Sequence, residues 1–286
     1  NTGILSCRAD QMKTWLDKLK NDNKKQEYYL TDIVSLAVKD EIAIHGHKSK
    51  IWEESMGIND KSELAKAERL LQKKLATQYM EAGLTLMDPS RIDIRGSLKH
   101  GQDVSVDVNV VFEGKVELGN NVTIGPNTYV SDSSIGDNTT IHANSHISDA
   151  SIGSDSEIGP FARIRPGAVF KNNVKIGNFV EIKKTVIDDF SKVNHLSYIG
   201  DATVGKNVNI GAGTITCNYD GANKHKTEIK DDAFIGSGVE LVAPIVIGKG
   251  ATVGAGSTLT KDAEDRKLTV ERSSQSTIEN WKRPKK

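Results

Sequence analysis

The sequence predicts a mainly β fold, a parallel β-helix, from three features of the segment between Leu118 and Leu259. Large apolar residues, nearly all aliphatic, recur at every sixth position, as in the run Ile152, Ile158, Ile164, Phe170, Ile176 and Ile182. Glycine follows many of them, as Gly153 does, and a small or β-branched residue such as Ser156 often lies two positions earlier. A six-residue period is typical of parallel β-helices. An ordinary β-sandwich with glycine turns has no reason to keep it.

Each six-residue unit has room for one short strand and one corner. Because strand side chains alternate between two faces, the aliphatic residue and the small residue before it both point inward. We expect the glycine to ease the corner, since it tolerates positive φ. Three units close one coil of about 18 residues, so Ile94 to Leu259 would hold roughly nine coils with one shared core. Five-residue steps, as from Val130 to Ile135, would be tightened corners.

The chain divides into four predicted parts. Residues 1–60 are expected to be a small α/β remnant of a larger domain, with too few strands for a core of its own. Residues 61–84 predict one linker helix, bracketed at its end by Gly83. The β-helix would occupy 85–260, and a polar tail 261–286.

Within residues 1–60, two helices and one strand are predicted. Apolar residues at helical spacing favour a helix over 12–19. Thr31-Asp32 can cap a second helix that carries Ile33, Leu36 and Ala37 on one face. Residues 41–46 are strand-like.

Composition excludes several classes of protein. The 286 residues carry 38 basic and 38 acidic side chains, so the net charge of zero does not favour a nucleic-acid partner. No segment approaches the roughly 18 apolar residues of a membrane span, and no signal peptide opens the chain. Two cysteines far apart, Cys7 and Cys217, favour a reduced, cytoplasmic location.

One stretch of the repeat is dense in chemically active residues. Lys183 follows Arg165 by 18 residues, one full coil, so the two cations would stack about 4.8 Å apart. Such a pair suits a dianion such as a sugar phosphate. His195 would act as general base near neutral pH, although a lone histidine is more often a packed or surface residue. Other side chains here could hold sugar hydroxyls or orient the nucleophile: Tyr198, Asn209 and Glu181.

Other sequence patterns carry less weight. His45 with His47, and His142 with His146, lack a nearby acidic or cysteine partner, so a metal site there is not favoured. Residues 211–213 are glycine-rich but precede no helix, which argues against a phosphate-binding loop. The insertion at 217–227 leaves the repeat, and such insertions usually carry function or a contact.

Four motifs make the chain resemble a known family: residues 164–167, 177–184, 195–198 and 209–221. It is similar, over essentially its whole length, to the bacterial bifunctional glucosamine-1-phosphate N-acetyltransferases and N-acetylglucosamine-1-phosphate uridyltransferases. These enzymes serve UDP-N-acetylglucosamine biosynthesis for peptidoglycan and lipopolysaccharide. The resemblance implies a left-handed β-helix, a homotrimer with active sites at subunit interfaces, and acetyl-CoA as cosubstrate. The 2-amino group would attack the thioester directly, so Cys217 need not be catalytic.

The resemblance also assigns roles to individual residues. It implies His195 as proton acceptor with Glu181 at the amine side. It implies that the sugar phosphate is bound by Arg165, Lys183, Tyr198 and Asn209. It implies an acetyl-CoA cleft lined by Ala212, Asn218, Tyr219, Ser237, Ala255 and Arg272. The sequence around Arg272 departs from the family pattern, so that contact is the least secure.

The uridyltransferase half is expected to be inactive in this chain. Asn1 and Asn59 correspond to a sugar-nucleotide contact and a magnesium ligand, but the family's glycine-rich nucleotide-binding opening is missing. Magnesium would serve only that missing activity, and no metal is expected in the acetyltransferase site. Two alternatives remain open: a hexapeptide-repeat carbonic anhydrase with three histidines on zinc, and a non-catalytic scaffold whose loop 217–227 binds a partner.

Overall fold

The computed structural model describes residues 3–48, 55–272 and 274–283. The chain forms two compact units, Asn1–Leu71 and Gln72–Lys286. Their boundary falls inside one long helix, α3 (Lys61–Glu81), whereas the sequence had placed a boundary on each side of a helix at 61–84. Among the described residues, no helix has both the length and the apolar character needed to cross a membrane.

The first unit holds α1 (Ala9–Leu16), the 3₁₀ turn η1 (Leu30–Asp32) and α2 (Ile33–Lys39). Its small core joins Trp15 to Ile33 and Ala37, and the Trp15 Nε1–H donates to Asp40 Oδ2 at 2.8 Å. Both predicted helices are present. The expected side-chain cap is not formed, since η1 leads directly into α2. The predicted strand at 41–46 is irregular, because the described part of this unit offers no strand to pair with.

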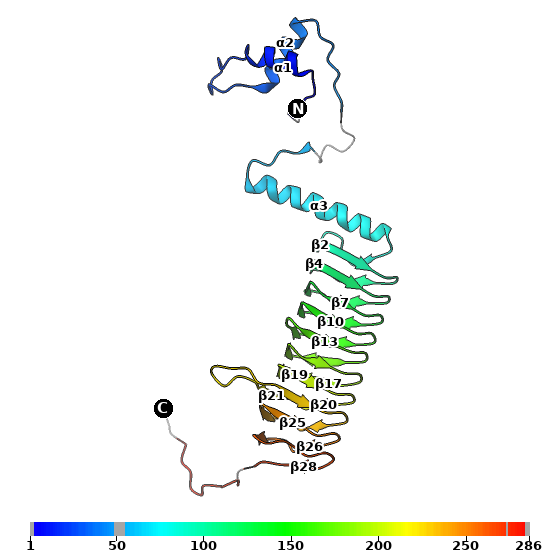
Figure 1. Cartoon of the computed structure of the whole chain (residues 1–286), viewed down its shortest axis with the longest axis vertical. Helices are drawn as coiled ribbons and strands as arrows, with labels where there is room; N and C mark the ends of the chain where they lie inside the picture. Colours follow the sequence, from blue (N-terminus) through cyan, green and yellow to red (C-terminus); the bar gives the residue numbers. More distant parts are fainter. Residues whose placement is uncertain (1–2, 49–54, 273, 284–286) are drawn as a thin grey trace. The chain divides into compact units, whose positions relative to one another are not determined.

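The second unit is the predicted left-handed parallel β-helix (Figure 1). We call its three walls faces A, B and C. Face A is an eleven-stranded sheet: β1 (Thr85–Leu86), β3 (Ser105–Val106), β5 (Thr123–Ile124), β8 (Thr140–Ile141), β11 (Glu157–Ile158), β14 (Lys175–Asn178), β17 (Lys192–His195), β20 (Asn209–Ile210), β23 (Phe234–Ile235), β26 (Thr252–Val253) and β28 (Leu268–Thr269).

Faces B and C are joined by two long strands, which turn from one face into the other: β2 (Ile92–His100) and β4 (Val110–Leu118). Face B continues as β6 (Tyr129–Ser131), β9 (His146–Ser148), β12 (Arg163–Ile164), β15 (Glu181–Lys183), β18 (Tyr198–Gly200), β21 (Ile215–Cys217), β24 (Glu240–Val242) and β27 (Thr258–Leu259). Face C continues as β7 (Ser134–Ile135), β10 (Ala150–Ile152), β13 (Ala168–Phe170), β16 (Val186–Ile187), β19 (Ala202–Val204), β22 (Thr227–Ile229) and β25 (Ile245–Ile247).

The register of the paired strands follows the six-residue period of the sequence. Ile164 pairs with Ile182, 18 residues on, and Ile182 pairs with Ile199, 17 residues on. The five-residue steps are therefore tightened corners, as predicted. Val204 pairs with Ile229, a longer step that accommodates the loop 217–227. The predicted inward aliphatic residues form one continuous core, and small polar residues such as Ser156 are buried as well.

The predicted role of the repeat glycines is wrong for most of them. Apart from Gly159, the glycines that follow the aliphatic residues do not have positive φ. They are needed because successive coils approach closely: a Cβ on Gly211 would lie 2.6 Å from the Gly236 carbonyl carbon. Corners with positive φ are instead built largely from asparagine and aspartate, which tolerate this conformation. Asn121 and Asn138 are such corners, and the Asn121 Nδ2–H donates to Asn138 Oδ1 at 3.0 Å.

The N-terminal end of the β-helix core is covered by the second half of α3. Ala76 is buried in that core. The buried Gln72 amide binds the backbone of Ile94 in both directions, with Nε2 donating to the carbonyl oxygen at 3.0 Å and Oε1 accepting from the N–H at 2.7 Å. A solenoid needs such an end cap because its last coil otherwise exposes the core.

Candidate functional site

Arg165 and Lys183 lie in successive coils at the face B edge, as their spacing predicted. Each cation, however, has its own carboxylate. Arg165 Nη1 contacts Glu181 Oε1 at 2.6 Å, and Lys183 Nζ contacts Asp201 Oδ2 at 3.2 Å. The site is therefore an alternation of charges rather than a bare cationic pair.

Lys183 is the most enclosed of these groups, with 8% of its surface exposed. Asp201 accepts hydrogen bonds from Lys183 and from Asn218 Nδ2, and Asn218 Nδ2 also lies 3.4 Å from the Tyr198 hydroxyl. The ring of Tyr198 fits because Gly200 has no side chain: a Cβ there would lie 2.7 Å from Tyr198 Cζ. Tyr198 and Asn218, both predicted from the resemblance, thus contact the Lys183 cluster.

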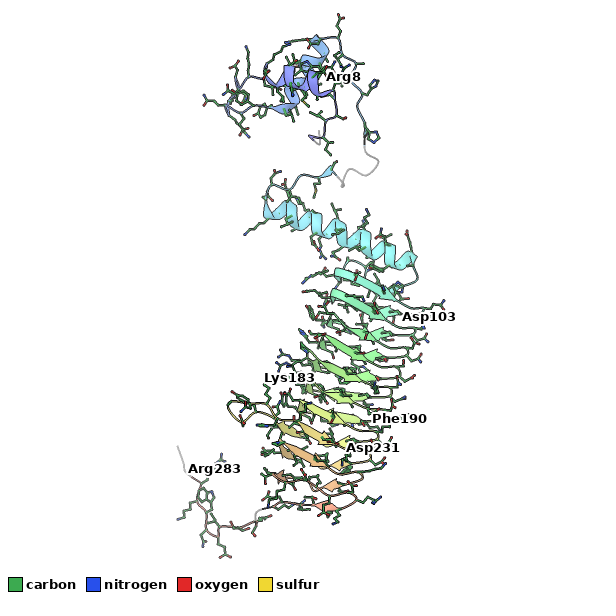
Figure 2. The ribbon with its side chains drawn as sticks, viewed as in Figure 1. Arg8, Asp103, Lys183, Phe190, Asp231 and Arg283 are labelled. Carbon is green, nitrogen blue, oxygen red and sulfur yellow. The ribbon has the colours of Figure 1, made fainter. Side chains whose placement is uncertain are left out.

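Lys224, in the loop at 217–227, also contacts this cluster. Figure 2 labels Lys183, the residue that it contacts. The neighbouring amine of Lys224, and then Asp201, raise the pKa of Lys183. The same contact lowers the pKa of Lys224. Sequence reasoning missed Asp201, which lies one residue past Gly200, the partner of Lys183 in the next coil. It also missed Lys224, which no periodicity could locate.

His195 is exposed at the end of β17, where face A meets face B. Its Nδ1 lies 2.8 Å from Asn178 Oδ1, one coil earlier. The amide oxygen can only accept, so this assignment puts the imidazole proton on Nδ1 and leaves the Nε2 lone pair available. Asn178 was not singled out from the sequence, although its 17-residue offset was the available signal.

The corner between faces A and B carries a column that we call the corner strip: His195, Ala212, Ser237 and Ala255. Backbone hydrogen bonds link each residue of the strip to the next coil, where the donor is the glycine directly after the next strip residue. The N–H of Gly213 donates to the carbonyl oxygen of His195 at 3.2 Å, that of Gly238 to Ala212 at 2.7 Å and that of Gly256 to Ser237 at 2.8 Å. These three glycines have φ of 74°, 65° and 73°. The strip beyond His195 is therefore nearly bare backbone. Arg272 Nη2 donates to the Ala255 carbonyl oxygen at 3.1 Å, at the strip's far end.

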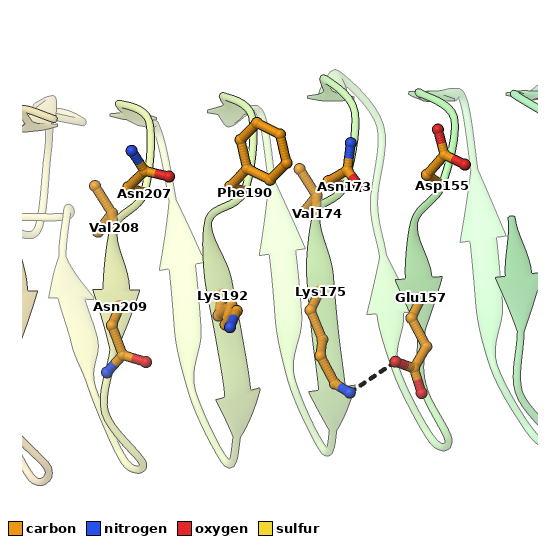
Figure 3. Close-up of a pocket in the computed structure, with 10 residues that line it drawn as sticks. All are labelled: Asp155, Glu157, Asn173, Val174, Lys175, Phe190, Lys192, Asn207, Val208 and Asn209. Carbon is orange, nitrogen blue, oxygen red and sulfur yellow. Dashed lines mark ion pairs between the residues drawn. The ribbon is translucent and has the colours of Figure 1, made fainter. Parts of the chain in front are cut away.

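Asn209 and Tyr219 lie elsewhere on the surface. Asn209 is at the start of β20 on face A, where it lines a hollow of about 510 Å³ with Lys175, Lys192 and Phe190 (Figure 3). Tyr219 is 60% exposed in the loop, and its hydroxyl donates to the Gly221 carbonyl oxygen at 2.6 Å. Within the described chain, no hydrogen bond or ion pair links Asn209 to the Lys183 cluster.

The residues assigned to the uridyltransferase site lie in the first unit. Asn59 is exposed before α3, and its backbone N–H donates to Glu63 Oε2 at 2.7 Å. Asn1 lies outside the described residues. In the described part of the chain, no group of three or more His, Cys, Asp or Glu side chains is arranged to hold a metal ion.

Cys217 and the paired histidines have other surroundings. Burial, and then the charge of Glu240, raise the pKa of the Cys217 thiol. His142 Nε2 lies 2.9 Å from Glu157 Oε1, whereas the ring of His146 lies against Tyr129 at 4.6 Å. His142 and His146 thus have separate partners.

Comparison with known proteins gives two family models and many curated relatives. Residues 94–171 match the GMPPB C-terminal domain, and residues 226–261 match the bacterial transferase hexapeptide (six repeats). The bifunctional protein GlmU of Ralstonia pickettii (strain 12J) is 54% identical over 287 residues, and that of Azoarcus sp. (strain BH72) is 53% identical over 286 residues. Each alignment covers 100% of this chain and 63% of the relative.

Among solved structures, the Arabidopsis UDP-N-acetylglucosamine acyltransferase matches 66% of this chain and 70% of its own. Its identity is 17% and its TM-score 0.33, too low to support an argument. The sequence comparison is much stronger, because it extends over every part of the chain. The chain is therefore a relative of the bifunctional GlmU proteins along its whole length, and it spans about 63% of theirs.

Proposed function

We propose that this chain transfers the acetyl group of acetyl-CoA to the amine of α-D-glucosamine 1-phosphate, a step towards UDP-N-acetylglucosamine. The relation to the GlmU proteins supports an acetyltransferase of this pathway. The observation that carries the residue assignment is the corner strip, with His195 at one end and small residues and glycines beyond it. Bare backbone of this kind admits an extended ligand, and three coil spacings make about 14 Å from His195 to Ala255.

The corner strip suits the pantetheine arm of acetyl-CoA. Its amides would hydrogen-bond to the exposed backbone at Ala212, Ser237 and Ala255, with the thioester near His195. Arg272 at the far end would meet the phosphates of the coenzyme. This arrangement supports the coenzyme contact that the sequence left least secure.

His195 would act as the base. The amine nitrogen attacks the thioester carbonyl carbon, the C–N bond forms, the C–S bond breaks, and the coenzyme leaves as thiolate. The proton lost by the amine goes to His195 Nε2, which the Asn178 contact leaves free. The donors of Asn218 are occupied by Asp201 and Tyr198, so a backbone N–H is the better candidate to stabilise the oxyanion.

The charged cluster would bind the sugar phosphate. A phosphate dianion can compete with Glu181 for the exposed fork of Arg165, while Lys183 stays oriented by Asp201. Lys224 adds a third basic side chain, next to Lys183. Glu181, once released from Arg165, would be free to hold the substrate amine.

We also propose that the chain works as a trimer with sites between copies. Upstream of the corner strip, the corner between faces A and B exposes three apolar side chains in successive coils, Phe161, Phe179 and Leu196, which are 48%, 55% and 63% exposed. The two phenylalanine rings stack with centroids 5.1 Å apart. An exposed apolar ridge favours association, and three copies around one axis would bury it. Asn209 on face A could then reach the site on face B of the adjacent copy.

A free-thiol assay with acetyl-CoA and glucosamine 1-phosphate tests the reaction. His195→Ala is expected to lower kcat by about 10²–10⁴-fold, because the base is lost, with no change in oligomeric mass. His45→Ala, an exposed histidine of the first unit, is the matched control and should retain full activity. Near-normal turnover of His195→Ala would defeat the base assignment. Stoichiometric zinc in the purified protein would favour the carbonic anhydrase alternative instead.

A further inference from the structure

Faces A and B carry opposite charges on matching coils. In the coil of β11 and β12, the outward residue of face A is Glu157 and that of face B is Arg163. One coil on, face A presents Lys175 and face B presents Glu181. The sign therefore reverses on both faces at the same step, so that each face is the electrostatic complement of the other over these two coils.

Glu157 is an exposed carboxylate held by cations of its own face. It contacts Lys175 Nζ at 2.7 Å, drawn as a dashed line in Figure 3, and His142 Nε2 at 2.9 Å, and these two partners lower its pKa. It is still 45% exposed. Arg163 is exposed on face B, and the described residues give it no ion-pair partner. Arg163 is thus a cation that an external carboxylate could reach.

Rotational symmetry brings these two residues to nearly the same height. Copies related by rotation about an axis parallel to the prism axis have equivalent coils at equal heights along it. The chain runs from face A to face B within a third of a coil, so in such an assembly Glu157 would lie about 1.6 Å in height from Arg163 of the adjacent copy. The residue one coil earlier on face B, His146, is about twice as far away in height and offers no fixed positive charge.

We propose that face A of one copy docks against face B of a second copy, with Glu157 paired to Arg163 across the interface so that the coils are held in register. Lys175 then opposes Glu181 of the adjacent copy in the next coil. The inference rests on the trimer of the proposed function and adds the pair that aligns it. The same register would bring Lys192 and Asn209, from the face A hollow, opposite the face B residues around Tyr198 of the adjacent copy. The sugar site is incomplete without that face.

A charge swap tests the pairing. Glu157→Lys and Arg163→Glu each place like charges across the interface, and each is expected to raise the concentration at which the trimer dissociates by about tenfold, measured by analytical ultracentrifugation. The double variant E157K/R163E again places opposite charges across the interface, so its trimer should dissociate at a concentration close to that of the wild type. The wild-type trimer should also dissociate more readily as salt is raised.

Glu117→Lys is the matched control on face C. Glu117 is 43% exposed and contacts two lysines, Lys115 at 3.1 Å and Lys99 at 3.5 Å. Reversing its charge therefore removes ion pairs within one chain, as Glu157→Lys does. It should leave the trimer unchanged. Circular dichroism would show that each variant keeps its β-helix.

Three results would overturn the inference: single variants that associate like the wild type, a double variant no better than the single ones, or a monomeric wild type. The acetyl-transfer assay separates this inference from the proposed function. If the double variant restores the trimer but the protein does not transfer acetyl groups, the interface proposal holds and the proposed function is wrong. If the protein transfers acetyl groups but its trimer is insensitive to the charge swap, the proposed function holds and the interface proposal is wrong.

Discussion

At the scale of single residues, the contact between His195 and Asn178 carries the most consequence. A neutral imidazole has one donor and one acceptor nitrogen, and the partner of one decides the role of the other. Asn178 Oδ1 at 2.8 Å makes Nδ1 the donor. Asn178 is thus a positioning residue in the proposed mechanism, because it acts through His195.

Replacing that amide with a carboxylate should shift the pH profile. In Asn178→Asp, a negative charge beside the ring favours the imidazolium, which cannot accept a proton. The acid limb of kcat/KM is therefore expected to move to higher pH by about one unit. Asn178→Ala should lower kcat without moving the limb in that direction. An unshifted profile for Asn178→Asp would argue against His195 as the base.

Cys217 provides the test of direct attack against an acyl-enzyme route. Burial and Glu240 raise the pKa of its thiol, which disfavours the thiolate that a nucleophile needs. Cys217→Ser is therefore expected to keep kcat within about twofold of the wild type in the free-thiol assay. An acetylated protein detected by mass spectrometry on Cys217, together with loss of turnover in Cys217→Ser, would establish the other route.

At the scale of the repeat unit, one corner changes character along the helix. In the coils of Phe161, Phe179 and Leu196 the residue with positive φ is bulky and apolar, whereas in the next coils it is Gly213, Gly238 and Gly256. The backbone path is the same in both stretches. The choice of corner residue alone therefore decides whether the corner is a ridge suited to another copy or a trough suited to a ligand.

Adding a side chain to the corner strip should weaken coenzyme binding without unfolding the protein. Gly238→Asn is compatible with the fold, because Asn127 and Asn144 have positive φ at this same corner. The added side chain would obstruct the strip at a cost of about 1–3 kcal/mol, so KM for acetyl-CoA is expected to rise about tenfold. Gly250→Asn makes the same change at the corner between faces C and A and is the control. Equal KM values in both variants would locate the coenzyme elsewhere.

At the scale of the whole molecule, the β-helix is a rigid rod whose surface columns are spaced by one coil. A ligand that lies along several coils binds the folded state and not the unfolded chain. Its effect on unfolding therefore distinguishes an enzyme from a scaffold whose loop 217–227 serves a protein partner.

Acetyl-CoA should raise the thermal unfolding temperature of the protein. At about 100 times its dissociation constant, a ligand specific to the folded state adds about 2.7 kcal/mol to the free energy of unfolding. Differential scanning calorimetry would measure this, and the gain should shrink in Gly238→Asn at the same ligand concentration. A melting temperature indifferent to acetyl-CoA would favour the scaffold.

The sequence by itself determined the β-helix, because a six-residue beat leaves one way to bury its aliphatic residues. It also determined that Arg165 and Lys183 occupy successive coils, since their spacing equals one turn. Inactivity of the uridyltransferase half and the site roles taken from the resemblance stay predictions.

Only the tertiary structure decided what those residues meet. The carboxylates Glu181 and Asp201, the amide of Asn178 and the amine of Lys224 come from other coils or from a loop, and their hydrogen bonds depend on side-chain conformations that spacing does not specify. It also decided the role of the repeat glycines, because the approach of one coil to the next is a property of the stack and not of the hexapeptide. The period sets which residues are neighbours, and packing sets which atoms touch.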